Sequence, residues 1–349
     1  MRNITKILTL ALATCVLAAC EKEEHVNGGT VNVKGAYVLN EGNMGPNNAS
    51  ISVLDIDSAK IDNEWFKNAN NNRMLGDQAQ DMVLYGSRLY VTVTESNTLE
   101  AIDTATGHST QVSMGSLKPR SIATHGGKLY ISCYNPPCVV RIDTASLAIE
   151  DTCFLGSYRP EGIAIAQGKA FIASSYLASN IRSYDDKVYV VGLDSFKVAA
   201  TVTVVCNPTP VVQLDNNTVA VGCIGNYGNI AANTVLINAT TLGTTTVGIG
   251  STKMAVYNGK LYSYSAPYGG TPSYAIISAD GSVSDFPFHP SIGGNPYAIG
   301  VNPSNGDIYL ANDGNYRVPG DLYCFRPDGT QRFKVEAGRL PSKIIFITD

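Results

Sequence analysis

The sequence predicts an all-β fold, a seven-bladed β-propeller with four-stranded blades, and three observations support this prediction. One pattern of short apolar strands and turns recurs seven times along the 349 residues. The copies follow one another at intervals of 40 to 48 residues, a period typical of propeller blades. The last copy stops after one strand, and the strands that it lacks occur near the start of the chain.

The copy that begins at Pro119 shows the pattern clearly. Its first apolar strand spans 121–124 and ends in a glycine-rich turn. A second strand with a central tyrosine spans 129–132, and a third strand over 139–143 ends in an aspartate. The seven copies begin at Ala79, Pro119, Pro160, Pro208, Ser251, Pro296 and Pro341.

The two ends of the chain complement each other. The copy that begins at Pro341 contains only the strand 343–348. The strands that it lacks are found at 36–40, 51–56 and 61–66. We therefore expect the C-terminal strand to complete the first blade, which would leave no long exposed edge strand.

Residues 1–19 are predicted to be a signal peptide. Arg2 and Lys6 form a basic start, and the apolar run 7–16 is too short to span a bilayer as a helix. The sequence Leu-Ala-Ala before Cys20 resembles the bacterial lipobox, after which the cysteine is acylated. The alternative is an ordinary signal peptide with an incidental cysteine.

Lipidation at Cys20 would make residues 20–34 a flexible, lipid-anchored tether and residues 35–349 the propeller domain. The tether starts with Glu-Lys-Glu-Glu directly after Cys20, and this acidic start resembles the surface-export signal of lipoproteins from gut Bacteroidetes. We expect a lipid-anchored outer-membrane protein that is exposed on the cell surface. A solvated linker on a periplasmic protein is the alternative.

The charge pattern argues against a nucleic-acid partner. The chain carries 25 Lys and Arg against 29 Asp and Glu, a net charge of −4. No run of basic residues forms a patch that would track phosphates. No CxxC spacing occurs either, so we expect no metal site.

The lack of catalytic motifs favours a binding protein over an enzyme. The sequence contains no HExxH, P-loop or nucleophile elbow. The four histidines are scattered, and only His289 falls in a loop of the expected ligand face. Asp103 and Asp143 precede turns at equivalent positions, where aspartate side chains bond backbone amides, so we expect them to be structural.

Six cysteines remain in the exported chain, because two others belong to the signal peptide and the lipobox. An exported protein can oxidise its cysteines. We predict a disulfide between Cys138 and Cys153, which begin a third strand and end a fourth strand. We predict another between Cys206 and Cys223, in neighbouring loops. Free buried thiols are the alternative.

The candidate ligand-binding residues lie in the loops between the second and third strands. These loops are long and differ between copies, and function often resides in such loops on a rigid scaffold. Tyrosine offers a flat contact area and asparagine both donates and accepts hydrogen bonds, which suits a large neutral ligand with apolar faces and a polar edge. The predicted binding residues of these loops are Tyr134, Tyr176, Tyr184, Tyr227, Tyr268, Tyr316, Asn135, Asn226 and Asn315. The alternative is that the loop tyrosines only cover the top of the propeller.

Charged residues beside the blade openings form a second set of candidates, near the central channel. Arg120 and Arg159 are the two that we predict to bind the ligand. The other charged residues at these positions are Asp81, Glu161, Lys253 and Lys343. The alternative is a solvated channel lining held by structural ion pairs.

Three features together resemble one family. They are the segment Tyr37–Asn43, the repeated Lys-Leu-Tyr strands, and the lipobox with its acidic tether. They resemble the YncE-like seven-bladed propeller lipoproteins of Bacteroidetes, most of all the BtuG type of surface cobalamin-binding lipoproteins. The resemblance implies capture of cobalamin or another corrinoid and delivery to a TonB-dependent transporter of the BtuB type. Cobalamin would be the transported ligand and not a cofactor.

Two other functions fit the same fold. A surface glycan-binding lipoprotein would use Trp or Tyr platforms beside carboxylates, and the single tryptophan, Trp65, falls in an outer strand. A lactonase-like propeller enzyme would need clustered carboxylates or a metal site at the mouth of the channel, and the loops contain few of either.

Overall fold

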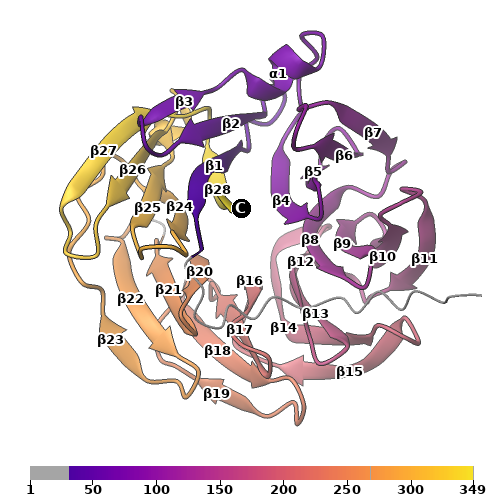
Figure 1. Cartoon of the computed structure of the whole chain (residues 1–349). Helices are drawn as coiled ribbons and strands as arrows, with labels where there is room; N and C mark the ends of the chain where they lie inside the picture. Colours follow the sequence, from indigo (N-terminus) through magenta and orange to yellow (C-terminus); the bar gives the residue numbers. More distant parts are fainter. Residues whose placement is uncertain (1–30, 268, 349) are drawn as a thin grey trace, which may run out of the picture. The chain divides into compact units, whose positions relative to one another are not determined.

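The computed structural model describes residues 31–267 and 269–348, and it confirms the seven-bladed β-propeller. Seven antiparallel sheets of four strands each stand around a central channel (Figure 1). The expected signal peptide at 1–19 and the lipidation residue Cys20 lie outside the described residues.

Each of the first three blades has four strands, ordered from the innermost strand outward. Blade 1 contains β28 (Pro341–Thr348), β1 (Val33–Asn40), β2 (Ser50–Asp55) and β3 (Lys60–Asp62). Blade 2 contains β4 (Ala79–Tyr85), β5 (Arg88–Val93), β6 (Thr98–Asp103) and β7 (Ser109–Ser113). Blade 3 contains β8 (Pro119–His125), β9 (Lys128–Tyr134), β10 (Pro137–Asp143) and β11 (Ile149–Phe154).

The other four blades follow the same order. Blade 4 contains β12 (Tyr158–Ala166), β13 (Lys169–Leu177), β14 (Asn180–Gly192) and β15 (Lys197–Thr203). Blade 5 contains β16 (Pro208–Gln213), β17 (Thr218–Cys223), β18 (Asn233–Asn238) and β19 (Thr244–Thr246). Blade 6 contains β20 (Lys253–Tyr257), β21 (Lys260–Ser265), β22 (Ser273–Ser278) and β23 (Val283–Asp285). Blade 7 contains β24 (Pro296–Val301), β25 (Ile308–Asn312), β26 (Asp321–Phe325) and β27 (Gln331–Glu336).

The C-terminal strand completes blade 1, as predicted. The β1–β28 ladder runs from Val33 opposite Thr348 to Asn40 opposite Pro341. The innermost strands of neighbouring blades contact each other around the ring, and β28 contacts β4 in this way. Because blade 1 contains both ends of the described chain, the ring cannot open there without breaking a β ladder.

The core consists of apolar layers between neighbouring blades. The aromatic residue of the second strand lies in such a layer, and Tyr90, Phe171 and Tyr309 are at most 2% exposed. Tyr90 of blade 2, for example, packs in one cluster with Ile131 of blade 3. These recurring aromatic side chains therefore have the predicted packing role.

The aspartates that end the third strands hold turns, which confirms their structural role. Asp103 Oδ1 accepts hydrogen bonds from the backbone N–H groups of Ala105 and Thr106, at 3.1 and 2.9 Å. Asp143 makes the equivalent bonds one blade further along. Each carboxylate thus caps its own turn.

Blade 1 departs from the prediction after β3. The sequence suggested a strand over 61–66, but β3 ends at Asp62 and a short helix, α1 (Trp65–Ala69), follows. Phe66 and Trp65 both pack against the same apolar cluster. Neighbouring residues of a strand point to opposite faces, so a helical turn explains how both aromatic rings reach one side.

The remaining helical segment in the described residues is a 3₁₀ turn, η1 (Gly314–Tyr316), between β25 and β26. In the described part of the chain, neither helical segment has the length and apolar character needed to cross a membrane.

The segment 174–187, expected to be a loop, forms an extended hairpin instead. β13 and β14 continue to pair through it, with Tyr176 opposite Tyr184 and Leu177 opposite Asn180. This extension accounts for the longest interval between two copies of the repeat. It also carries two of the predicted ligand-binding tyrosines.

The predicted disulfide between Cys138 and Cys153 is wrong. A β-bulge in β11 at Glu150 adds one residue between its ladder partners on β10. The bulge shifts the ladder by one residue, so Cys153 lies opposite Val139. A shift of one residue turns a side chain to the other face of a sheet, and the two cysteines pack in different interblade layers.

The predicted pair Cys206 and Cys223 consists of neighbouring free thiols. All six cysteines in the described residues are free. Cys223 ends β17 and lies opposite Pro208, two residues after Cys206. A disulfide between Cys206 and Cys223 therefore stays a prediction.

Candidate functional site

A large cavity opens among the loops that join second and third strands on one face of the propeller. Its volume is about 1030 Å³, and most of its wall comes from blades 4, 5 and 6. We call it the face cavity. Its exposed end is lined by Tyr176, Ile181, Tyr184, Tyr227, Ile230 and Pro267, and its buried end by Arg120, Glu161, Asn207, Thr209, Thr252 and Lys253.

The exposed end of the face cavity is apolar and aromatic. Ile181, Tyr227 and Ile230 are 67%, 66% and 40% exposed. The rings of Tyr184 and Tyr227 lie 6.0 Å apart between centroids and are tilted by 54°. Apolar side chains that gather on a surface beside a cavity are typical of a binding site.

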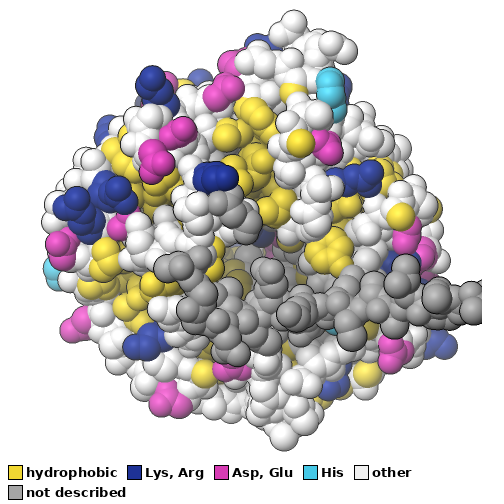
Figure 2. Space-filling model, in the orientation of Figure 1, with side chains coloured by type: hydrophobic (Ala, Val, Ile, Leu, Met, Phe, Trp, Pro, Cys, Tyr) yellow, Lys and Arg dark blue, Asp and Glu magenta, His cyan; other side chains and the backbone are white. Residues whose placement is uncertain are grey.

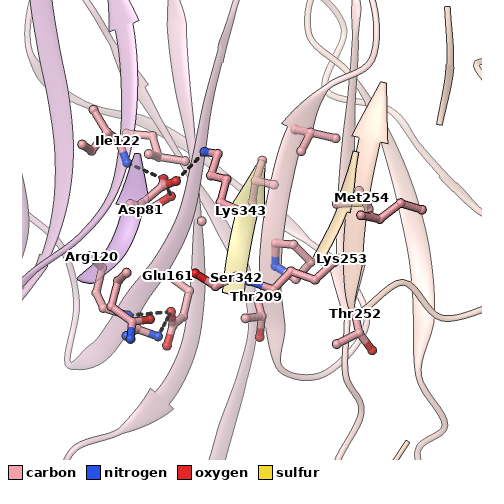
Figure 3. Close-up of a pocket in the computed structure, with 18 residues that line it drawn as sticks. Asp81, Arg120, Ile122, Glu161, Thr209, Thr252, Lys253, Met254, Ser342 and Lys343 are labelled. Atoms are coloured by element: carbon pink, nitrogen blue, oxygen red, sulfur yellow. Dashed lines mark hydrogen bonds and ion pairs between the residues drawn. The ribbon is translucent and has the colours of Figure 1, made fainter. Parts of the chain in front are cut away.

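The buried end of the face cavity meets a second cavity in the central channel. This channel cavity has a volume of about 230 Å³, and Figure 3 shows a close-up of its lining residues. The residues that line both cavities are Arg120, Glu161, Thr209, Thr252 and Lys253. A ligand in the face cavity would therefore reach a polar, charged junction.

An ion pair occupies one side of this junction. Arg120 on β8 donates from Nε and Nη2 to Glu161 Oε2, at 3.1 and 2.9 Å (Figure 3). Burial lowers the pKa of Arg120, but the Glu161 carboxylate more than offsets this, so that the pKa is raised overall. Glu161 is thus the counter-charge of the arginine.

Tyr134 lies beneath the cavity and not at its rim, where the sequence pattern predicted it. Its side chain is 7% exposed, and its hydroxyl donates to Glu161 Oε1. The guanidinium carbons of Arg120 and Arg159 lie 4.8 and 4.6 Å from the centre of its ring. Burial raises the pKa of Tyr134 well above its usual range, so the phenol keeps its proton.

Arg159, the other predicted arginine, supports the aromatic wall. Its Nη1 donates to the Tyr176 hydroxyl at 3.1 Å, and its guanidinium also lies over the Tyr176 ring. Tyr176 lines the face cavity directly, whereas Arg159 lies behind it. The structure therefore assigns Arg159 to positioning Tyr176.

A second ion pair lies at the other end of the channel cavity. Lys343 on β28 bonds Asp81 on β4, and the backbone N–H of Ile122 donates to Asp81 Oδ2 at 2.8 Å (Figure 3). Burial raises the pKa of Asp81, but the Lys343 ammonium outweighs burial and the pKa is lowered overall. This pair supports the alternative of a channel lining held by structural ion pairs.

Lys253 differs from the other channel cations. It begins β20 and lines both cavities, yet no carboxylate of the described residues lies within 4 Å of its ammonium group. The ring of Tyr297 lies 6.0 Å away. Burial lowers the pKa of Lys253, and the more distant charge of Glu41 opposes this only in part. Lys253 is therefore available to a ligand group.

Four of the other predicted binding residues do not line the face cavity, namely Tyr316, Asn135, Asn226 and Asn315. Tyr316 is 57% exposed and stands edge-on to Tyr297 in blade 7, with ring centroids 6.0 Å apart. The side chain of Asn226 accepts bonds from backbone N–H groups of its own loop. Asn135 donates to a backbone carbonyl, and Asn315 sits in η1. Tyr268 lies outside the described residues.

Sequence reasoning missed the aliphatic part of the cavity. Ile181 and Ile230 are apolar residues within polar segments, and that contrast is the one signal that could have marked them. The repeat pattern predicts a long loop around Ile181, so its position at the tip of the β13–β14 hairpin could not be foreseen. Asn207 and Thr252, at the buried end, carry no distinguishing pattern.

The described residues contain no group of three or more His, Cys, Asp or Glu side chains that could hold a metal ion. The visible face of the ring shows Lys and Arg side chains scattered among Asp and Glu, without a continuous basic stripe (Figure 2). The described lining of the face cavity thus offers a ligand tyrosine rings, aliphatic side chains, hydroxyl groups and one lysine without a nearby carboxylate.

Solved structures with the same architecture have diverse names. A quinonprotein alcohol dehydrogenase-like protein from Bacteroides thetaiotaomicron is 16% identical, with a TM-score of 0.66 over 90% of this chain and 79% of that one. A putative 6-phosphogluconolactonase from Bacteroides fragilis is 12% identical, with a TM-score of 0.64 over 92% and 100%. The periplasmic gluconolactonase of Pseudomonas aeruginosa is 12% identical, with a TM-score of 0.66 over 90% and 99%.

These similarities show the shared propeller fold. No curated protein matches the sequence. Residues 34–258, which contain the three outer strands of blade 1, blades 2 to 5 and the innermost strand of blade 6, match the family described as Domain of unknown function (DUF5074). Since the match spans more than half of the sequence, the chain belongs to the DUF5074 family.

Proposed function

We propose that this protein is a surface lipoprotein that captures cobalamin or another corrinoid and passes it to a TonB-dependent outer-membrane transporter of the BtuB type. The observation that carries the proposal is the face cavity, with its large volume, its tyrosine and isoleucine rim, and its polar buried end. Cobalamin has a flat ring with apolar faces and an edge of amide groups, and it also carries one phosphate diester.

The two ends of the cavity suit different parts of such a ligand. Tyr184 and Tyr227 would contact the flat faces, since aromatic rings contribute large contact areas with few rotatable bonds. Asn207 and Thr252 at the buried end offer hydrogen bonds to amides. The Lys253 ammonium would bind the phosphate. No carboxylate of the described residues lies within 4 Å of this ammonium group, so none competes with the phosphate for it.

The site is organised before the ligand arrives. Glu161 holds Arg120 and Tyr134, and Arg159 stacks on Tyr134 and bonds Tyr176. A connected network of hydrogen bonds and ring contacts of this kind keeps its side chains in one arrangement. Preorganisation of this kind reduces the entropy lost on binding and supports tight capture without chemistry.

Delivery to a transporter rests on the expected lipid anchor. Cys20 and the acidic residues after it predict attachment to the outer membrane at the cell surface. A tethered capture protein would raise the local concentration of a scarce vitamin beside its transporter.

Calorimetric titration of the chain from Glu21 onward with cyanocobalamin tests the proposal. We expect tight binding at one ligand per protein and a rise in melting temperature. No heat and no change in melting temperature at tens of micromolar cyanocobalamin would contradict the corrinoid proposal. A panel of polysaccharides would then test the glycan-binding alternative.

A second candidate function is lactone hydrolysis. Neighbours in fold are named 6-phosphogluconolactonase and gluconolactonase, and Glu161 and Lys253 adjoin a cavity as an acid–base pair would. A pH-stat assay with glucono-δ-lactone and 6-phosphogluconolactone would detect this activity. Lactone hydrolysis by the wild type that is lost in Glu161→Gln would favour the enzyme. If the wild type hydrolyses neither lactone faster than the uncatalysed rate, ligand capture remains the proposed function.

A further inference from the structure

Cys133 and Cys138 face each other across the hairpin that joins β9 and β10. Cys138 lies directly opposite Cys133 in the antiparallel ladder, without an intervening bulge. Directly opposite residues of an antiparallel pair have Cα atoms about 4.5 or 5.5 Å apart. A disulfide needs a separation of roughly 4.4 to 6.8 Å. The backbone therefore already has the spacing that a disulfide requires.

The two side chains also share one face of blade 3. Both belong to the apolar cluster that contains Ile131 and Val140, and both are completely buried. The Cys133 thiol donates to the backbone carbonyl of Ile131 at 3.6 Å. Burial raises the pKa of Cys133, and the neighbouring Cys133 thiol lowers the pKa of Cys138. Cys153, by contrast, packs in the layer on the other face of the blade.

We infer that Cys133 and Cys138 form a disulfide bond when the protein folds in an oxidising compartment. The oxidant is a disulfide of a thiol–disulfide oxidoreductase or of glutathione. The thiolate of one cysteine attacks that disulfide, forms a mixed disulfide and releases one thiol. The other cysteine then displaces the second thiol. Two protein thiols thus lose two electrons and two protons, and the donor disulfide is reduced to two thiols.

The bond would tie the end of the hairpin directly beneath the candidate site. Residues 134–137 form the hairpin tip, and the ring of Tyr134 within it lies against the guanidinium groups of Arg120 and Arg159. A covalent link next to Tyr134 would hold that residue below Arg120 and Arg159. This inference is independent of which ligand the cavity binds.

Burial dictates when the bond can form. Both sulfur atoms are inaccessible in the folded protein, so the exchange must precede closure of the interblade layer. Once the blades have packed, the same burial protects the bond from reductants. A protein folded in a reducing buffer should therefore stay reduced on later exposure to oxidised glutathione.

The experiment refolds the reduced, denatured chain from Glu21 onward in a glutathione redox buffer and, separately, in dithiothreitol. Each sample is denatured, alkylated and digested with trypsin. The peptide Leu129–Arg141 contains both cysteines and no internal cleavage site, so its mass reports the bond directly. We expect this peptide to escape alkylation and to be lighter by two hydrogen atoms after oxidative refolding.

Two matched variants sharpen the result. Cys133→Ser should leave Cys138 open to alkylation in both buffers, whereas Cys324→Ser should leave the oxidised peptide unchanged. The melting temperature of the wild type and of Cys324→Ser should be several degrees higher after oxidative refolding. Doubly alkylated Leu129–Arg141 from wild type in the glutathione buffer, or a link from either cysteine to a third one, would overturn the inference. The wild-type peptide decides the question even if a variant fails to fold.

Discussion

The ring of Tyr227 from blade 5 lies 6.0 Å from the ring of Tyr184 from blade 4, at a tilt of 54°. The two residues are brought together because the β13–β14 hairpin extends beyond the usual blade length. Tyr227 has a positive φ of 55°, a conformation that is uncommon outside glycine, and its side chain is 66% exposed. A residue held in this way, with its ring in solvent, is suited to contact a ligand.

We expect Tyr184→Ala combined with Tyr227→Ala to weaken cyanocobalamin binding by about 10- to 100-fold, because truncated aromatic contacts dominate many interfaces. The melting temperature should hardly change, since most of the Tyr227 side chain is exposed to solvent. Phe154→Ala is the matched control, because Phe154 is 65% exposed and does not line the face cavity. Calorimetry measures affinity, and a large loss of melting temperature would instead assign the tyrosines to structure.

Glu161→Gln should destabilise the propeller by about 3 kcal/mol, because it leaves the largely buried Arg120 without its counter-charge. The measurement is the free energy of unfolding from urea denaturation. Glu64→Gln removes an exposed ion pair to Lys67 and should cost less than about 1 kcal/mol. If the two substitutions lower the free energy of unfolding equally, burial does not increase the contribution of the Arg120–Glu161 pair to stability.

Asp81 should make the stability fall at low pH. Its pKa is lowered in the folded protein, so its contribution is present above the unfolded value of about 3.9 and is lost as the pH falls through the folded value. Urea midpoints of the wild type and Asp81→Asn between pH 7 and pH 2 measure this contribution. The difference should be constant near neutrality and should shrink below about pH 4. A difference that grows on acidification would refute the assignment.

Lys253→Met should stabilise the protein and weaken its binding of a phosphate-bearing corrinoid. The lysine is charged without a close carboxylate, and its removal should raise the free energy of unfolding by about 1 kcal/mol at pH 7. Because its folded pKa is lowered, the unfolded chain binds the proton more tightly. Wild-type stability should therefore recover relative to the variant as the pH rises toward about 10.4.

Two comparisons separate the role of Lys253 from general charge effects. Lys197→Met, at an exposed position on β15, should change neither stability nor affinity. Cobinamide, which lacks the phosphate, should bind the wild type and Lys253→Met equally well. If Lys253→Met loses affinity for cobinamide and cobalamin to the same extent, the phosphate contact is excluded.

The sequence predicted the fold well because the propeller repeats itself. Seven copies of one strand pattern leave little freedom in the order of strands, and Pro341 marked the closing strand by the same rule as Pro119. The site residues were harder to predict, because a repeat shows which loops share a face but not whether each side chain points into the cavity or into the core. Tyr134 followed the pattern of a rim residue and is buried, whereas Tyr227 is at the rim.

Departures from the regular ladder account for the largest errors. A single extra residue at Glu150 moved Cys153 to the other face of blade 3, and nothing in the composition of β11 marks that bulge. The extended pairing of Tyr176 with Tyr184 likewise depends on contacts between strands that lie apart in sequence. Register is set by long-range packing, which a single sequence reveals only in part.

The pairing of Val33 with Thr348 means that the described chain begins and ends side by side, at the end of blade 1 away from the loop after Asn40. That loop lies on the same face as the candidate site, since Asn43 bonds the Tyr316 backbone there. A short peptide could therefore join the two ends, and new termini could be cut at an exposed turn such as Gly126–Gly127. Such a circular permutant would keep every blade. It could be immobilised through blade 3 instead of blade 1, while its cavity stays open to solution.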